Sequence, residues 1–392
     1  MRHPHSCPAV INALTALSLL LVLILCGISC KKEQEGEEQP AHHKEDGFVS
    51  IVDESFADYC FANFDFNNDG HISLEEAALV KEIQVSGLGI RSLHGIEYFV
   101  NLSHLNCSRN LILDQVYIDL SQNTALTSLD CSGNQFKYVD LSQNTALTSL
   151  NCSGNQLTIL DINQNTALTS LDCSGNQLTN LYVEYNTSLT ILDCSGNQLT
   201  DLFLGDNTSL TSLDCSGNQL ASLSISKNTA LTSLDCSENQ LTHLVVEKNT
   251  ALTSLNCSGN RLSDLNVEDN TALTSLDCSE NQLASLSISK NTALTSLNCS
   301  GNRLSDLNVE DNTALTSLDC SENQLTRLDV ENNTALTSLD CSDNQLTYLD
   351  VSKNTCLNEL HCKGNPLDHI YLKNGQNIPT LEIPEGCNII YK

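Results

Sequence analysis

Cysteine is the residue whose spacing in this chain most demands a chemical explanation. Twelve cysteines follow one another at intervals of 21 residues from Cys131 to Cys362, and Cys107 lies 24 residues before the first of them. In an exported chain such a series usually forms disulfides, and grouped cysteines and histidines also bind metal ions. However, no CxxC pair occurs in the series, and a histidine stands beside a cysteine only at His361. The spacing therefore favours buried, reduced thiols over a disulfide framework or a metal site.

A second candidate for chemistry precedes the cysteine series. The segment DFNNDGHISLEE fits the EF-hand pattern D-x-[DN]-x-[DN]-G-x5-E, in which oxygen atoms surround a calcium ion. Helix-like runs flank it, with Phe56, Phe61 and Phe64 before and residues 77–83 after. The alternative is a turn that only caps helices. We expect structural Ca²⁺ with a dissociation constant of about 10⁻⁴–10⁻³ M, held by Asp65, Asn67, Asp69, His71 (through its carbonyl), Ser73 and Glu76.

The residues around each cysteine define a repeating unit. It reads L-x-x-L-x-C-x-x-N-x-L-x-x-L-x-V-x-x-N-x-x and divides into two similar halves, such as LTSLDCSGNQ and LTNLYVEYNTS from Leu168. In each half the fourth and sixth positions are apolar, and they point the same way in an extended strand. No segment of the unit is long enough for a helix, and Asn, Thr and Ser dominate the corners. The pattern predicts a solenoid with strands on two faces.

Stacking of such turns accounts for the cysteines and asparagines. Equivalent cysteines in adjacent turns would lie about 4.8 Å apart with parallel Cα–Cβ bonds, whereas a disulfide needs converging Cβ atoms about 3.5–4.5 Å apart. Cysteine then acts as a small hydrophobic residue in the core. Two asparagine columns, exemplified by Asn134 with Asn155 and Asn144 with Asn165, are expected to bind the backbone of neighbouring turns.

The unit resembles the leucine-rich repeat, in the cysteine-containing 21-residue form of internalin J-like bacterial surface proteins. The resemblance covers residues 102–367, about 13 turns, and implies a mainly β leucine-rich-repeat solenoid. Internalins also begin with a small α-helical cap related to an EF-hand and often free of metal. We expect that cap at 50–88 and a transition at 89–101. Residues 368–392 leave the period and are expected to form a C-terminal cap.

The N-terminus is typical of an exported lipoprotein. The apolar run LTALSLLLVLIL is short for a membrane span and ends in CGISC, which resembles a bacterial lipoprotein cleavage box. Residues 1–29 would be the signal peptide, Cys30 the lipidated residue, and 30–49 a disordered acidic tether. The expected location is the outer membrane or cell surface. Lipidation at Cys26 and plain secretion remain alternatives.

Charge restricts the partners. The net charge is −30, and the 18 basic residues are scattered singly, so nucleic acid and anionic membrane surfaces are poor partners. The aspartate column Asp172, Asp193, Asp214 and Asp235 invites cations or raised pKa values, although a solvated polar face with Ser hydrogen bonds is preferred. No nucleophile–base pair and no Gly-rich phosphate loop was found, so we expect a monomer without enzymatic activity.

Two functions fit this sequence. The first is a binding module for a protein or glycan at the cell surface, and the second is a structural spacer or scaffold without a specific ligand. Residues 248–283 and 290–325 are identical, which favours the spacer, whereas an aromatic group in the earlier turns favours binding. The tail leaves one pairing open, because Cys356 and Cys387 could form a disulfide. The expected partner-binding residues are Tyr138, Ile159, Tyr182, Tyr185 and Phe203.

Overall fold

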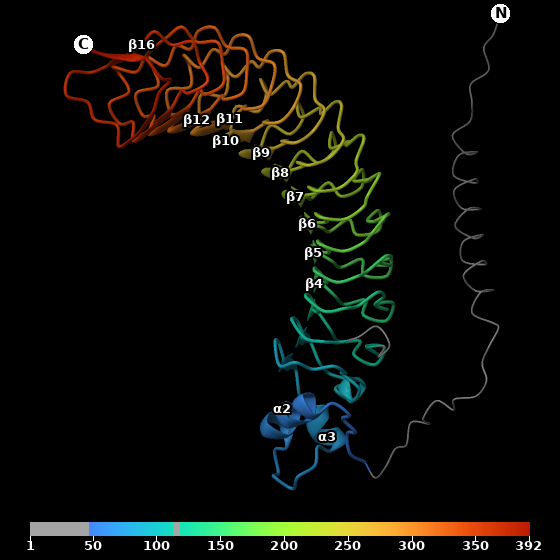
Figure 1. Ribbon diagram of the computed structural model, residues 1–392. Helices are drawn as coiled ribbons and strands as arrows, with labels where there is room; N and C mark the ends of the chain where they lie inside the picture. The colour runs from blue at the N-terminus through green and yellow to red at the C-terminus, as the bar shows by residue number, and fades with distance from the viewer. Residues whose placement is uncertain (1–46, 113–117) are drawn as a thin grey trace, which may run out of the picture. The chain divides into compact units, whose positions relative to one another are not determined.

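A computed structural model describes residues 47–112 and 118–392, and Phe48–Lys392 forms one compact body. The predicted signal peptide, Cys30 and nearly all of the predicted tether lie outside the described residues. In the described part, no helix has the length and apolar character needed to cross a membrane. Within the body the turns stack in an arc, and the long sheet lines its inner side (Figure 1).

The long sheet is parallel and has 15 strands, one from each turn. Each strand pairs with the equivalent residues of the next turn, so that Ser149 lies opposite Ser170 and Leu150 opposite Leu171. Its strands are β1 Glu82–Gln84, β2 His104–Asn106, β3 Ser128–Asp130, β4 Ser149–Asn151, β5 Ser170–Asp172, β6 Ile191–Asp193, β7 Ser212–Asp214, β8 Ser233–Asp235, β9 Ser254–Asn256, β10 Ser275–Asp277, β11 Ser296–Asn298, β12 Ser317–Asp319, β13 Ser338–Asp340, β15 Glu359–His361 and β17 Thr380–Glu382.

The predicted solenoid is confirmed and extends beyond its predicted ends. The strands within 102–367, β2 to β13 and β15, are thirteen in number, as expected. The sheet gains β1 before them and β17 after them. Each strand is three residues long because only the central leucine points into the core, while its two neighbours face outward before the chain turns.

Regular strand pairing on the second face is limited to the C-terminal turns. There β14 Tyr348–Asp350, β16 His369–Leu372 and β18 Asn388–Tyr391 form a parallel sheet of three strands. Earlier turns show only isolated bridges, such as Phe203 opposite Ser224. In these turns part of the backbone binds side chains instead, since the Leu157 N–H donates to Asn176 Oδ1 of the next turn at 3.0 Å.

The core consists of leucine columns, the cysteine ladder and two asparagine ladders. All ladder cysteines are buried and unpaired, as predicted. Asn176, in the first asparagine column, donates from Nδ2 to the carbonyls of Cys152 and Cys173. Asn165, in the second column, donates to the carbonyls of Leu141 and Asn144. Corners without sheet pairing are therefore closed by buried amides, which stabilises the stacking of turn on turn.

The N-terminal end is covered by a small helical cap. Helix α2 runs over Glu54–Phe64 and begins at Asp53, whose side chain accepts a hydrogen bond from the Phe56 N–H. Helix α3 covers only Leu74–Ala77, and a 3₁₀ turn, η1, covers Ile96–Tyr98. The predicted helical run over 77–83 is wrong, because Ile83 and Val85 alternate into the core and the chain pairs as β1 with β2.

Residues 368–392, predicted to cover the last turn, instead add β16, β17 and β18 and thus continue both sheets. Cys356 is exposed and Cys387 is partly buried, and both thiols are unpaired.

Candidate functional site

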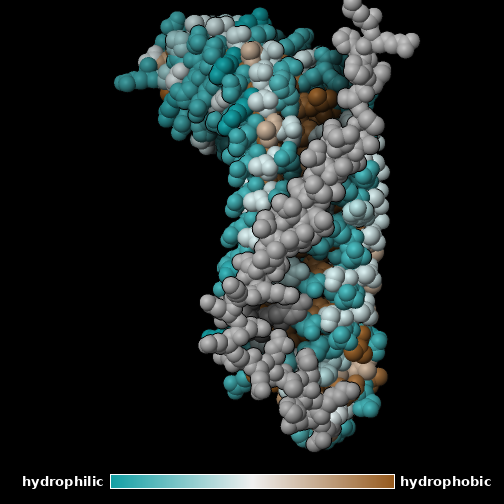
Figure 2. Space-filling view, turned by 90° about the vertical axis from the view of Figure 1, so that its right-hand side faces the viewer, coloured by the Kyte–Doolittle hydropathy of each residue, from teal (hydrophilic) through white to brown (hydrophobic). Residues whose placement is uncertain are grey.

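Five apolar side chains of the earlier turns stand exposed on the side opposite the long sheet, as predicted. The exposed fractions are 49% for Tyr138, 62% for Ile159, 43% for Tyr182, 64% for Tyr185 and 63% for Phe203. We call these five residues the outer patch. Figure 2 looks onto this side, where brown apolar groups interrupt a teal and white surface.

Alternation along the second half of each turn exposes these side chains. Tyr182 stands between Leu181 and Val183, which are 3% and 0% exposed, so Tyr182 must point outward in an extended chain. Phe203 has the same position one turn later. Stacked equivalents lie about 4.8 Å apart. The outer patch is therefore a diagonal stripe across four consecutive turns, with Phe136 excluded because it is buried in the core.

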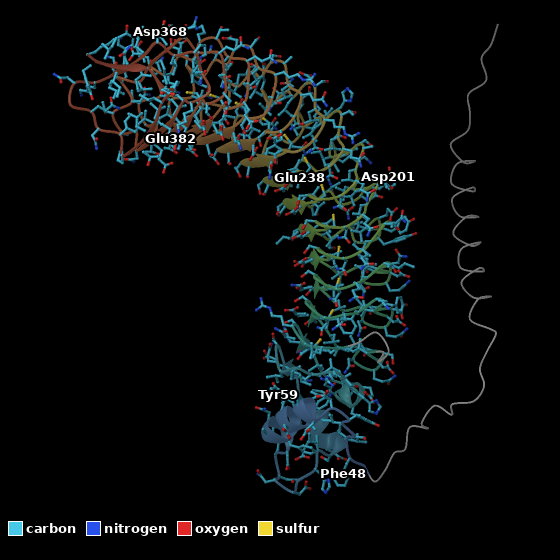
Figure 3. All side chains as sticks on the ribbon, in the orientation of Figure 1. Phe48, Tyr59, Asp201, Glu238, Asp368 and Glu382 are labelled. Atoms are coloured by element: carbon cyan, nitrogen blue, oxygen red, sulfur yellow. The ribbon has the colours of Figure 1, made fainter. Side chains whose placement is uncertain are left out.

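Carboxylates border the outer patch. Burial, followed by the nearby charges of Asp140 and Asp161, raises the pKa of the Tyr138 hydroxyl. Asp201 points away from the body on the same side (Figure 3). In the sequence, Glu184 stands next to Tyr185, and Asp206 follows Phe203 by three residues. The stripe thus combines apolar rings with negative charge, a combination that suits a partner with apolar and basic side chains.

Sequence analysis missed an exposed apolar residue on the long sheet. Ile191 is 47% exposed in β6, at a position held by serine in the strands on either side, Ser170 and Ser212. The substitution of Ile for Ser, in a column that otherwise holds serine from β3 to β13, is the signal that could have found it. Val245 is also exposed, by 57%, in the same column as Tyr182 and Phe203 but two turns later.

The aspartate column of the long sheet is a hydrogen-bonded polar surface. Asp214 Oδ1 accepts bonds from the Ser216 N–H at 3.0 Å and the Ser216 hydroxyl at 2.6 Å. Burial, and to a lesser extent the charges of Asp193 and Asp235, raises the pKa of the Asp214 carboxyl above its usual value. The two hydrogen bonds from Ser216 lower this pKa but are outweighed. Further along, Asn256 donates from Nδ2 to Asp235 Oδ2 at 2.9 Å. Both expectations for this column, Ser hydrogen bonds and a raised pKa, are therefore met at Asp214.

The thiols of the cysteine ladder have raised pKa values, which makes them poor nucleophiles and metal ligands. Burial, with a smaller contribution from Asp130, raises the pKa of the Cys131 thiol to about 12. Burial likewise raises the pKa of Cys173 well above its usual value, followed by the effect of the adjacent Cys152 and Cys194 thiols. A thiol must ionise to act as a nucleophile or metal ligand. The ladder therefore serves packing and not reactivity.

The predicted calcium loop binds its own carboxylates through its backbone. Asp65 accepts hydrogen bonds from the N–H groups of Asp69 at 3.1 Å and Gly70 at 2.9 Å. Asn67 Oδ1 accepts from the Asp69 N–H at 2.7 Å, and Asp69 Oδ1 accepts from the His71 N–H at 2.9 Å. Gly70 has a φ of 86°, which supplies the expected sharp turn.

Glu76 closes the loop from its other end. Its Oε1 accepts from the N–H groups of Phe66 at 2.9 Å and Asn67 at 3.1 Å, and its Oε2 accepts from the Ser73 N–H and hydroxyl, each at 2.9 Å. The Ser73 N–H contributes most to lowering the pKa of the Glu76 carboxyl, and the other donors add to it. Ser73 Oγ accepts from the Glu76 N–H in return, which completes a capping box for α3.

The loop therefore gathers hard oxygen ligands of the kind Ca²⁺ prefers, but the arrangement is also that of a helix-capping turn. Within residues 47–112 and 118–392, no three His, Cys, Asp or Glu side chains come together in a group that could hold a metal ion. Both Glu76 oxygens are engaged by donors of the loop. Coordination by Glu76 would require it to exchange some of these bonds for the ion.

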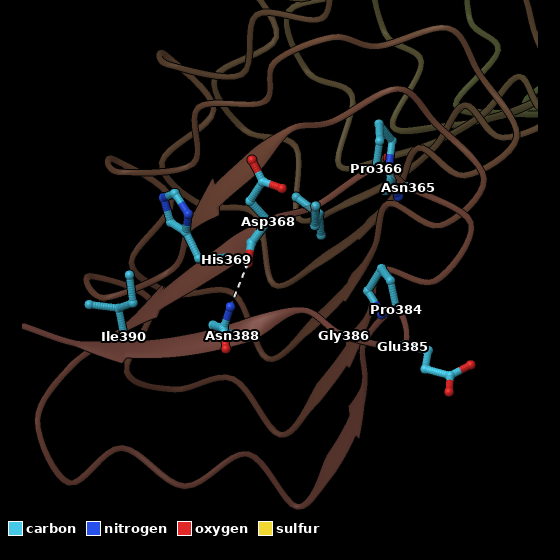
Figure 4. Close-up of a pocket in the computed structure, with 10 residues that line it drawn as sticks. Asn365, Pro366, Asp368, His369, Pro384, Glu385, Gly386, Asn388 and Ile390 are labelled. Carbon is cyan, nitrogen blue, oxygen red and sulfur yellow. Dashed lines mark hydrogen bonds between the residues drawn. The ribbon is translucent and has the colours of Figure 1, made fainter.

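An open hollow of about 760 Å³ lies at the C-terminal end of the solenoid (Figure 4). Its ionisable side chains are Asp368, His369 and Glu385, and Glu385 points away from the other two (Figure 4). Asn388 Nδ2 donates to the Asp368 carbonyl at 3.4 Å. No serine, threonine, cysteine or lysine lines this hollow.

Turns of 21 residues, a parallel sheet with one strand per turn, and buried asparagine and thiol ladders together define a leucine-rich-repeat protein. A family model described as leucine-rich repeats (2 copies) matches residues 187–228. The functional domain of InlJ from Listeria monocytogenes, which includes a cysteine ladder, is 36% identical with a TM-score of 0.71, over 82% of this chain and 75% of that chain. The chain belongs to the leucine-rich-repeat family and is structurally close to the internalins of Listeria.

Two other solved structures are similar. The internalin InlF of Listeria monocytogenes is 26% identical with a TM-score of 0.70, over 79% of this chain and 94% of that chain. YopM, a leucine-rich effector protein from Yersinia pestis, is 25% identical with a TM-score of 0.64, over 81% and 90%. No curated protein sequence matches the chain.

Proposed function

We propose that the chain is a non-enzymatic protein of the bacterial cell surface, anchored to the outer membrane through a lipid on Cys30, which binds a partner through the outer patch. The observation that carries this proposal is the exposure of four aromatic rings and Ile159 on consecutive turns. Side chains of this kind are enriched at interaction sites, and solenoids use their extended faces for binding.

The partner that the outer patch suits best is a protein with basic and apolar side chains. Asp140, Asp161 and Asp201 border the patch, and the chain as a whole carries a net charge of −30. Opposite charge at the edge of an interface accelerates and orients association. A glycan is the alternative, since aromatic faces also bind sugar rings. The identical later turns, 248–283 and 290–325, serve in this proposal as spacer.

The test is a double substitution in the outer patch, Tyr182→Ser with Phe203→Ser. The variant introduces the serine that Ser224 carries naturally one turn later, so folding should be unchanged. A partner is first captured from a mixture of cell-surface proteins with the parent chain, and its dissociation constant is then measured by surface plasmon resonance. We expect the double variant to bind at least about 10-fold more weakly, as the loss of about 1.4 kcal/mol at a central contact would give.

The control is His243→Ser with Val245→Ser, two turns beyond Phe203; Val245 lies in the column of Tyr182 and Phe203, and His243 in that of Tyr138 and Ile159. This control should bind as tightly as the parent. Equal affinity of the parent and the patch variant would remove the patch from the proposal and favour the spacer function. Loss of the partner after glycosidase treatment, but not after mild proteolysis, would identify a glycan.

We also propose that the 65–76 loop binds one structural Ca²⁺. Its donors are the carboxylates of Asp65, Asp69 and Glu76, the Asn67 amide, the Ser73 hydroxyl and the His71 carbonyl. Support comes from the complete sequence pattern and from a loop already bent at Gly70 with these side chains turned inward onto its backbone. The ion would brace the cap beneath the first turn of the solenoid.

A further inference from the structure

The two ends of the solenoid are closed differently. At the N-terminal end the cap places Phe56 and Cys60 of α2 in the core, each 0% exposed, together with Ile72 at 1%. At the C-terminal end the last elements are β17 and β18, which are strands of the solenoid itself. Solenoids need polar capping units at their ends to remain soluble as single chains. Within residues 47–112 and 118–392, only the first end has a cap of this kind.

Core columns reach the surface at the C-terminal end. In one column Leu349 and Ile370 are fully buried, but their next partner, Ile389, is 36% exposed. In the neighbouring column Leu372 is 2% exposed and its partner Tyr391 is 55% exposed. The last members of both columns thus have packed neighbours on one side and solvent on the other, so that apolar surface remains to be buried.

Both sheets also end in an open strand edge. The Asn388 N–H donates a hydrogen bond to the carbonyl of Asp368, just before β16, and the Lys392 N–H donates to the carbonyl of Leu372, the last residue of β16. Donors alternate along a strand in a parallel sheet, so the amides of Ile389 and Tyr391 face outward.

The edge of the long sheet follows the same alternation. In β17 the Thr380 N–H donates to Asn358, and the Glu382 carbonyl accepts from Cys362, which leaves the Leu381 backbone at the edge. Exposed edges of this kind are templates for pairing with another strand.

Charge does not oppose self-association at this end. Residues 353–392 contain four lysines and four acidic residues, whereas the whole chain has a net charge of −30. Several of these charges pair within the chain, as Lys363 does with Glu382 at 3.2 Å and Lys392 with Asp350 at 2.6 Å. Two copies can therefore meet here without the repulsion that opposes contact between the acidic turns.

We propose that the C-terminal end of the solenoid binds a second copy of this chain, with β17 and β18 each pairing with its own copy across a two-fold axis. An axis that lies across the end, perpendicular to the strands, places each edge strand antiparallel to its equivalent. One rotation then closes both sheets and covers Leu381, Ile389 and Tyr391 together. This dimer replaces the monomer expected from the sequence, and it does not depend on the partner of the outer patch.

The first test is the mass of the purified full chain, measured by sedimentation equilibrium. A concentration of about 10–100 μM populates a contact with a micromolar dissociation constant. Reductant is present because Cys356 is exposed and could form a disulfide between copies. We expect a dimer. Ile389→Pro removes an outward amide and no bond to β16, so it should raise the dimer dissociation constant at least 10-fold. The control Ile389→Val keeps both the amide and an apolar side chain and should still dimerise. A monomeric parent at the highest concentration would overturn the proposal.

The second test remains informative if the proline variant folds poorly. Ile390 lies on the outward face of the small sheet, beside His369 (Figure 4). Because β18 has only four residues, Ile390 of one copy would lie close to Ile390 of the other copy across the two-fold axis. Ile390→Lys and Ile390→Glu should each be monomeric because like charges meet across the axis. Their equimolar mixture should form heterodimers in native mass spectrometry. Dimers in both single variants, or monomers in the mixture, would contradict a two-fold contact at this end.

Discussion

Burial distinguishes two kinds of cysteine in this chain. Cys236 is fully buried, and its thiol is 3.6 Å from the Asn256 carbonyl, whereas Cys356 is exposed. Cys236→Ser places a hydroxyl where an apolar sulfur packs, so it should lower the free energy of unfolding by about 1–3 kcal/mol in urea denaturation with reductant. The control Cys356→Ser should change it little. If Cys236→Ser proves as stable as the parent, the ladder does not contribute through apolar packing.

Asp214 can be compared with Asn256, the asparagine at the equivalent position two turns later. Asp214 lies between Asp193 and Asp235 on the long sheet, while the equivalent Asn256 donates a hydrogen bond to Asp235. Asp214→Asn should remove repulsion, provide a donor to Asp193 and keep the acceptor for Ser216. We expect the free energy of unfolding at pH 7 to rise by about 1 kcal/mol.

The pH dependence of that gain follows from the raised pKa of Asp214. A carboxyl with a folded-state pKa above its unfolded value favours folding below the unfolded pKa and loses that contribution as the pH rises through the folded pKa. The advantage of Asp214→Asn should therefore shrink as the pH falls through the raised folded-state pKa, and it should be smallest below about 4, where the carboxyl is protonated in both states. Asn256→Asp is the reverse control and should destabilise at pH 7. A gain for Asp214→Asn that is unchanged by pH would exclude the charge as its cause.

Among the elements, those built by the repeat could be predicted and those built by single contacts could not. Leu171 and Cys173 alternate into the core in every equivalent turn, so period and spacing alone place β5 and its neighbours. The segment 77–83 has the apolar content of a helix, but α3 ends at Ala77, and Glu82–Gln84 pairs as a strand with His104–Asn106. The sequence pattern predicted Ser73 and Glu76 as metal ligands. It did not predict the hydrogen bonds between them, because these depend on backbone geometry that the pattern does not specify.

The cap is the element on which calcium should act. Ca²⁺ at about 10 mM should raise the melting temperature, because this concentration is about 10 to 100 times the expected dissociation constant, and an ion that binds only the folded loop then adds about 1.4–2.7 kcal/mol. Glu76→Gln should abolish this Ca²⁺-dependent rise, although it also lowers the basal melting temperature by weakening the capping box. Glu75→Gln, next to it and outside the ligand set, should keep the rise. No heat in isothermal titration and no thermal shift at several millimolar would leave the loop as a helix-capping turn.

For the whole molecule, the sequence predicted the family, the 21-residue repeat and the exposure of Tyr182 and Phe203, because each follows from the 21-residue period. It did not predict that residues 368–392 continue both sheets. Residues 368–392 depart from the period, and whether they cover the last turn or extend it is decided by the register of β16 and β18. Ile191 was overlooked for a different reason, since a single apolar residue in a serine column has no periodic signature.

Anchoring is also a property of the whole molecule. Cys30→Ser should move the protein from the membrane fraction to the soluble fraction, because no lipid could then be attached at the predicted site. The matched control is Cys26→Ser, which tests the alternative cysteine and should leave the protein in the membrane fraction. Immunoblotting of separated fractions measures both. If the Cys30 variant remains with membranes, the predicted lipid site is wrong.

Strand pairing joins each turn of the solenoid only to its two neighbours, and every turn from Cys131 to Cys362 has the same length. A force that pulls the two ends of the body apart would therefore meet a series of equivalent mechanical units. Each turn that peels away releases 21 residues, about 70 Å of extended chain, while the remaining turns keep their packing. The molecule would lengthen in equal steps under tension and refold by the same steps, so it behaves as an extensible link between its two ends.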